Sequence, residues 1–194
     1  MSKALMASSD SQTPQLGFWL YLMTDCLLFA SLFATFAVLR TGTAGSVGAA
    51  DIVDMNYVLL QTLLLLTSSA TSGFALVAAR AKQYTYSLVW LLVTVVLGFG
   101  FLALELHEFQ NLIADGHGWE TSAFLSAFFT LVGTHGLHIT AGLIWAGTLV
   151  SVVLRRGITQ RYLKQLTLFT LFWHFLDVVW IFIFTFVYAM GSIL

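Results

Sequence analysis

A histidine and an aspartate stand one helical turn apart near the end of the chain, in the run Trp173-His174-Phe175-Leu176-Asp177-Val178-Val179-Trp180. This run lies inside a long apolar stretch that suits a lipid bilayer. An ionisable group at membrane depth is costly unless it has a partner, and such groups mark functional or structural sites. We therefore expect His174 and Asp177 to bond with each other, with the nearby indoles of Trp173 and Trp180, or with polar groups on neighbouring helices.

Further ionisable residues fall inside or at the edge of apolar stretches: Asp25, Glu105, His135 and His138. One hypothesis for this set is a metal or haem site, because imidazoles and carboxylates are metal ligands. His135 and His138 are three residues apart on one helical face, so they cannot bind opposite sides of one haem. Each would need a ligand from another helix, and His174 is the remaining intramembrane histidine.

A second hypothesis is a proton relay or an autonomous transporter, since transporters place such groups near the middle of the membrane. An odd number of apolar stretches gives no inverted repeat, and the single proline, Pro14, lies outside them. The third hypothesis is structural: the polar groups bond to one another across helices and fix a bundle that faces a larger partner. We favour the third hypothesis and keep the relay as an alternative.

Composition sets the class of protein. Of the 194 residues 59% are hydrophobic and only 9% are charged, which excludes a soluble domain. Five apolar stretches can cross about 30 Å of hydrocarbon as helices: residues 17–39, 57–79, 86–104, 122–154 and 166–193. They lack the two-residue alternation of a barrel. The sequence thus predicts an all-α integral membrane bundle of five transmembrane helices, a single domain over residues 1–194 with a polar N-terminal tail at 1–16.

The basic residues predict the orientation of this bundle. Most of them fall on the side of the N-terminus: Lys3, Arg80, Lys82, Arg155, Arg156, Arg161 and Lys164. Arg40 is the exception. Because cytoplasmic segments are enriched in Lys and Arg, we expect a cytoplasmic N-terminus and a periplasmic C-terminus. The net charge of −1 favours no nucleic-acid partner.

Small residues predict where helices approach each other closely. Ala123 and Ala127, and likewise Gly142 and Ala146, are spaced four apart on the fourth stretch, as in packed transmembrane helices. The single cysteine, Cys26, cannot form an internal disulfide, and we expect it to be a small buried side chain.

Three motifs carry a resemblance to a known family. They are Leu-Met-Thr-Asp-Cys-Leu-Leu-Phe at 22–29, Ser-Ala-Phe-Phe at 126–129 leading to Gly-Thr-His-Gly-Leu-His at 133–138, and Phe-Trp-His-Phe-Leu-Asp-Val-Val-Trp at 172–180. With these three motifs in this order, the chain resembles subunit III of the haem-copper terminal oxidases over nearly its whole length. Its five-span form and its first motif are most similar to the bacterial ubiquinol oxidases of the cytochrome bo type.

The resemblance implies a subunit with no haem, copper, other metal or catalytic residue of its own. It implies contact with catalytic subunit I, which holds the haem and copper, reduces oxygen and pumps protons, and with subunits II and IV. The chain would be a multi-pass protein of a bacterial inner membrane. Its role would be to support the assembly and stability of the catalytic subunit.

The resemblance also implies residue roles. Asp25 matches a buried carboxylate that reacts with hydrophobic carbodiimide and is linked to proton uptake, although many relatives carry the longer Glu there. A structural polar network within the last three spans would contain Glu105, His135, His138, Trp173, His174, Asp177 and Trp180. Family members fold as two groups of helices, here the first two and the last three, with phospholipid bound in a cleft between them.

We therefore expect a non-catalytic subunit III of a proton-pumping respiratory quinol oxidase, an oxidoreductase that passes electrons from quinol to oxygen. Nothing in these residues identifies the electron donor. A cytochrome c oxidase subunit III and an accessory subunit of a nitric oxide reductase are therefore alternatives. The autonomous proton-relay transporter is the alternative of another class.

Overall fold

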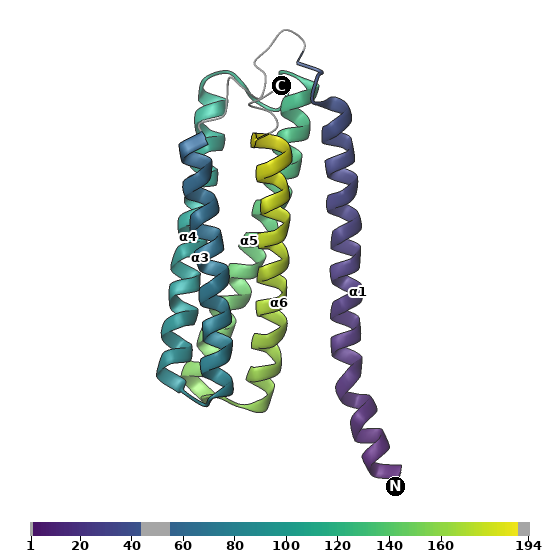
Figure 1. Cartoon of the computed structure of the whole chain (residues 1–194), viewed down its shortest axis with the longest axis vertical. Coiled ribbons are helices and arrows are strands. Elements are labelled where there is room, and N and C mark those ends of the chain that lie inside the picture. The colour runs from purple at the N-terminus through teal and green to yellow at the C-terminus, as the bar shows by residue number, and fades with distance from the viewer. Residues whose placement is uncertain (1, 44–54, 190–194) are drawn as a thin grey trace.

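The computed structural model describes residues 2–43 and 55–189, with side chains described from residue 15 onward. Its long helices are α1 (Ser2–Leu39), α3 (Met55–Arg80), α4 (Tyr84–Ala114), α5 (Ala123–Arg156) and α6 (Gln160–Ile183), and a π-helix, η1 (Phe184–Ala189), extends α6 (Figure 1). In the described part of the chain, five helices have the length and hydropathy of membrane spans. The prediction of an all-α protein with five spanning helices is confirmed.

The helices extend beyond the predicted spans. The helix α4 continues to Ala114 rather than ending at residue 104, so the first part of the segment between the third and fourth predicted spans is helical. The backbone of the polar tail continues α1, which begins at Ser2. Hydropathy marks where a helix leaves the hydrocarbon, whereas its backbone hydrogen bonds can continue in the polar region. Residues 190–193 of the last predicted span lie outside the described residues.

The expected grouping of the helices is wrong. The second span, α3, packs along α4 and against α6, and together with α5 these helices form a four-helix bundle. Only α1 stands apart, on α5 with a smaller contact to α6 (Figure 1). The buried face of α3 is rich in Ser and Ala, which let neighbouring backbones approach closely, as at Ser68, Ser72, Ala75 and Ala79.

Local signals fix the ends of α5 and α6. Ser122 caps α5 by accepting a hydrogen bond from the Leu125 N–H at 3.1 Å, and Thr159 caps α6 in the same way from Tyr162. Gly157 ends α5 with a φ of 66°, a left-handed conformation that favours glycine. The chain therefore turns sharply, and α6 returns along α5.

Trp173 fills the centre of the bundle between two glycines. A Cβ atom on Gly142 of α5 would lie 2.6 Å from Trp173 Cζ3, and one on Gly98 of α4 would lie 2.9 Å from Cζ2. The Trp173 indole donates a hydrogen bond to the Ser68 hydroxyl of α3 at 3.0 Å. This one side chain joins all four helices, and the predicted close packing at Gly142 and Ala146 is confirmed.

A single stripe of side chains attaches α1 to the bundle. Its buried residues among 15–39 are Leu22, Asp25, Phe29 and Phe36, spaced three, four and seven residues apart along one helical face. Cys26 points away from this stripe and is exposed, so the expectation that it is buried is wrong. The stripe brings Asp25 of α1 against α5.

Candidate functional site

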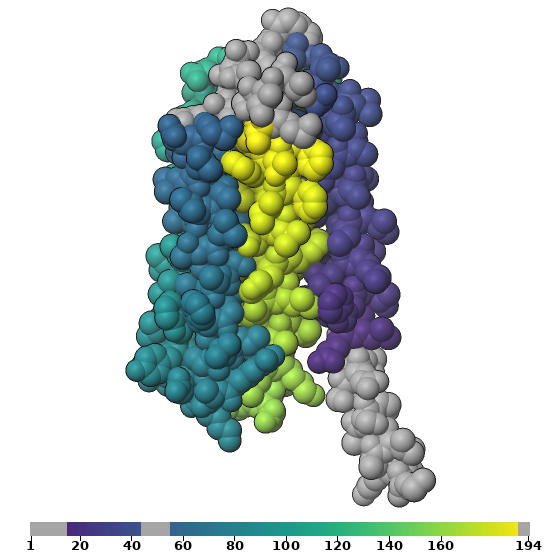
Figure 2. Space-filling view, viewed as in Figure 1, coloured from purple at the N-terminus to yellow at the C-terminus, as the bar shows by residue number. Residues whose placement is uncertain are grey.

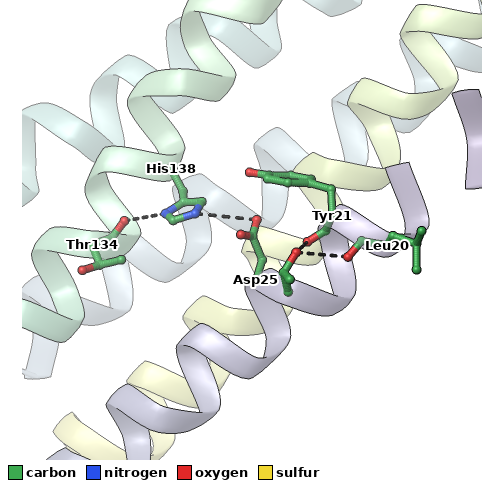
Figure 3. Close-up of polar contacts among 6 residues, drawn as sticks. Leu20, Tyr21, Asp25, Thr134 and His138 are labelled. Carbon is green, nitrogen blue, oxygen red and sulfur yellow. Dashed lines mark hydrogen bonds and ion pairs between the residues drawn. The ribbon is translucent and has the colours of Figure 1, made fainter. Parts of the chain in front are cut away.

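Asp25 of α1 faces His138 of α5 (Figure 3). The His138 Nε2 atom lies 3.6 Å from Asp25 Oδ2, and the two side chains are only 17% and 9% exposed. This separation is longer than a direct hydrogen bond but within the range of an ion pair. The pair is the contact that links the peripheral helix to the bundle through ionisable groups.

The orientation of the His138 ring is fixed by its other nitrogen. His138 Nδ1 lies 2.8 Å from the Thr134 carbonyl oxygen, which can only accept, so Nδ1 carries a proton and donates it (Figure 3). The Nε2 atom of the same ring then faces the Asp25 carboxyl group.

The surroundings of the pair are largely aromatic. The Phe29 ring lies 5.2 Å from the His138 ring. Tyr21, one turn before Asp25, lies beside the pair (Figure 3). Tyr21 is exposed, whereas Asp25 is buried. An exposed phenol is thus a neighbour of the buried carboxyl group.

Glu105 and His135 lie deep inside the four-helix bundle. The Glu105 carboxyl group packs on Gly136, where a Cβ atom would lie 2.6 Å from Oε1. His135 is fully buried and stacks on Trp180 with ring centres 5.3 Å apart. Among the described residues, neither the Glu105 oxygens nor the His135 nitrogens have a hydrogen-bond partner. The structure brings the two into the same core without a bond between them.

The tryptophans of α6 connect it to α3. The Trp180 indole donates to the Thr62 hydroxyl at 3.1 Å, as Trp173 donates to Ser68. The sequence predicted indole hydrogen bonds across helices, and it expected Asp or His rather than hydroxyls to provide them with partners. The signal that sequence reasoning missed was the hydroxyl groups of α3, at the buried Ser68 and the half-buried Thr62.

Sequence reasoning also missed a second carboxylate, Glu108. Its oxygens accept hydrogen bonds from Gln61 Nε2 at 3.1 Å and from the Tyr188 hydroxyl at 3.4 Å. These contacts join α4 to α3 and η1. Glu108 lies beyond the predicted stretch 86–104, which ends where hydropathy falls, although its spacing of three from Glu105 puts both on one face of a helix.

His174 and Asp177 have different partners in the structure. His174 Nδ1 donates to the Thr170 carbonyl at 2.7 Å, and its ring is exposed on the outer side of α6. Asp177 is buried beside the Ser69 hydroxyl of α3. No ion pair joins His174 to Asp177 among the described side chains. The pair predicted from the sequence is thus only a neighbouring arrangement.

The histidines of the spans do not converge. His138 faces α1, His135 stacks inside the bundle, and His174 lies on its surface. Within residues 15–43 and 55–189, no three His, Cys, Asp or Glu side chains are grouped closely enough to hold a metal ion. The predicted network is therefore divided into an α1–α5 pair, a central pair of unbonded groups, and the contact between α3 and α6.

The fold and these contacts define a helical membrane protein whose buried polar groups join its spans. The family model described as cytochrome c oxidase subunit III matches residues 7–192, and this chain belongs to that family. Cytochrome bo(3) ubiquinol oxidase subunit 3 of Pseudomonas aeruginosa is 51% identical over 177 residues, covering 91% of this chain and 85% of the relative. The same subunit of Pseudomonas putida is 52% identical over 182 residues, covering 94% and 88%.

A relative whose name gives another electron donor is also similar. Cytochrome c oxidase subunit 3 of Bacillus sp. (strain PS3) is 44% identical over 187 residues, covering 96% of this chain and 90% of the relative. The resemblance seen in the three sequence motifs is confirmed by these comparisons.

Proposed function

We propose that this chain is the non-catalytic subunit III of a proton-pumping quinol oxidase in a bacterial inner membrane. The observation that carries the proposal is the identity above 50% to two relatives named as ubiquinol oxidase subunit 3, along nearly the whole of each chain. In this proposal the chain supports the assembly and stability of catalytic subunit I. Haem and copper belong to that partner, and subunits II and IV complete the complex.

The proposal includes an orientation and a lipid. The basic ends of α3 and α5 face the cytoplasm together with the N-terminus, and the C-terminus faces the periplasm. Bound phospholipid occupies the apolar groove of about 270 Å³ between α1 and η1, lined by Phe33, Phe36 and Phe186 with Arg40 at one end. An acyl chain suits the aromatic walls, and a phosphate suits the arginine. This groove replaces the cleft expected between two groups of helices.

Co-purification tests the proposal. A tagged copy of this chain is extracted from its own membrane in a mild detergent, and the eluate is examined by mass spectrometry, optical spectroscopy and oxygen consumption. We expect a large haem-bearing subunit and quinol-dependent oxygen consumption. Recovery of the chain alone, colourless and folded, would support independent transport. Oxidation of reduced cytochrome c instead of quinol would show that the chain is subunit III of a cytochrome c oxidase.

We also propose that Asp25 and His138 act as one unit in proton uptake. Asp25→Asn and His138→Gln each remove a group that can bind a proton at this contact, so each should slow proton uptake by the intact complex, and the double variant should be no slower than the slower single variant. The measurement is proton uptake and oxygen consumption by the reconstituted oxidase.

The control for this prediction is Thr24→Ala. The Thr24 hydroxyl bonds to the carbonyls of Leu20 and Tyr21 on the exposed side of α1, so its loss should leave proton uptake unchanged. Multiplicative effects of the two single variants in the double variant would show that Asp25 and His138 act independently.

A further inference from the structure

An imidazole lies on the outer surface of α6, about halfway along the span. His174 is fourteen residues beyond Gln160, which corresponds to roughly 21 Å along the helix axis. The helix α6 is open to the exterior between α3 and α1 (Figure 2). The side chain of His174 is exposed there, in contrast to the buried residues Trp173 and Leu176 beside it. A polar side chain thus faces out at the depth of the hydrocarbon.

The free atom of this imidazole is a hydrogen-bond acceptor. Nδ1 donates its proton to the Thr170 carbonyl, so in the neutral ring Nε2 holds a lone pair. No described residue donates a hydrogen bond to Nε2. One turn further on, Asp177 Oδ1 is also without a hydrogen-bond partner among the described residues. Two acceptors on neighbouring turns of α6 therefore lack donors.

Lipid cannot supply those donors. The hydrocarbon core contains neither water nor hydrogen-bonding groups, so a polar side chain that faces it keeps its polar atoms unsatisfied. The outer face of α4 shows what a lipid-facing surface of this protein looks like, since its exposed side chains are apolar, for example Val89, Leu92, Val96 and Phe99. The surface around His174 departs from that pattern.

The neighbours of His174 leave room for a helix. Gly73 of α3 lies beside the imidazole, where a Cβ atom would come no closer than 4.0 Å to Cε1. Val178 and Ile181 are exposed on the following turns of α6. A small residue next to apolar side chains and one polar group is the composition through which transmembrane helices pack on each other.

We propose that the His174 surface, defined by His174, Val178 and Ile181 of α6 with Gly73 of α3, is where a transmembrane helix of another oxidase subunit docks. That helix places a hydrogen-bond donor against His174 Nε2. The inference rests on the proposed function, because it requires the chain to work inside an oxidase complex. It goes further by assigning the face and the chemistry of the contact.

Site-specific photo-crosslinking in the intact complex tests the location. A benzophenone amino acid replaces Val178 in one variant and Val96, on the outer face of α4, in the control. We expect a crosslink to another oxidase subunit from position 178 and none from position 96. A crosslink from position 96 alone, or lipid adducts alone from position 178, would overturn the proposal. Failure of the unmodified chain to co-purify with any oxidase subunit would instead refute the proposed function.

Two substitutions test the hydrogen bond. His174→Phe keeps a ring but removes the acceptor, and His174→Gln restores an acceptor oxygen. From the usual strength of an interhelical hydrogen bond in a membrane, we expect His174→Phe to weaken the association of the chain with the complex by about 3- to 15-fold. We expect His174→Gln to recover part of this loss. The readout is the fraction of chain retained during a detergent titration of the purified complex. Equal retention of the wild type and both variants would contradict the proposed bond.

Discussion

Gly142→Ala is expected to destabilise the bundle by about 3 kcal/mol, the upper part of the range for overpacked cores. The new methyl group would lie 2.6 Å from Trp173 Cζ3, and the opposite edge of the indole is already held against Gly98. Trp173 can move only by giving up its hydrogen bond to Ser68. Reversible unfolding of the purified chain in mixed detergent and SDS, followed by circular dichroism, measures the loss.

Gly147→Ala provides the matched control. Gly147 lies on the same helix as Gly142, but no atom lies within 4 Å of a Cβ atom placed there. Its replacement should be neutral or stabilising by up to about 1 kcal/mol, because alanine is the better helix former. Equal destabilisation by both substitutions would mean that the close packing around Trp173 does not determine the stability of the bundle.

Trp180→Ala should cost about 3 to 5 kcal/mol, as truncation of large buried aromatic residues does in protein cores. The indole is fully buried, stacks on His135 and meets the edge of Phe101 at a centroid distance of 4.7 Å. Removing it leaves a cavity between α4, α5 and α6 and takes away the donor to the Thr62 oxygen, while the Thr62 hydroxyl keeps its own hydrogen bond to the Val58 carbonyl. The same unfolding assay applies.

Trp180→Phe separates the contribution of aromatic packing from that of the hydrogen bond to Thr62. Phenylalanine keeps most of the aromatic contacts but cannot donate to Thr62, so we expect a loss of about 1 kcal/mol, the usual net value of one hydrogen bond. If Phe and Ala were equally destabilising, the hydrogen bond rather than the packing would dominate at this position.

The spans could be predicted because lipid imposes a length and a composition on each helix separately. The end of α4 could not, because the helix continues to Ala114 after hydropathy has fallen, carrying Glu105 and Glu108 on one face. The arrangement of the helices was beyond this kind of reasoning. The position of α3 depends on how Ser68 and its small neighbours fit against α4 and α6, which hydropathy does not encode.

The candidate site was predicted as a set of residues and not as a set of contacts. Asp25 and His138 were both identified, yet their contact depends on which face of α1 meets α5. His174 and Asp177 are neighbours in sequence, and sequence proximity suggested a pair where the structure gives each residue a separate partner. Trp173 and Trp180 were expected to bond across helices, and their hydroxyl acceptors emerged only from the fold.

The attachment of α1 through a residue of α5 has a consequence for biosynthesis. At about 5 to 20 residues per second, the ribosome needs on the order of 5 to 25 s to extend the nascent chain from residue 25 to residue 138. During that interval Asp25 enters the bilayer before its imidazole partner has been made. The newly inserted first span must therefore wait at the translocon or in lipid with its acidic side chain unmatched, and the arrival of α5 completes its insertion.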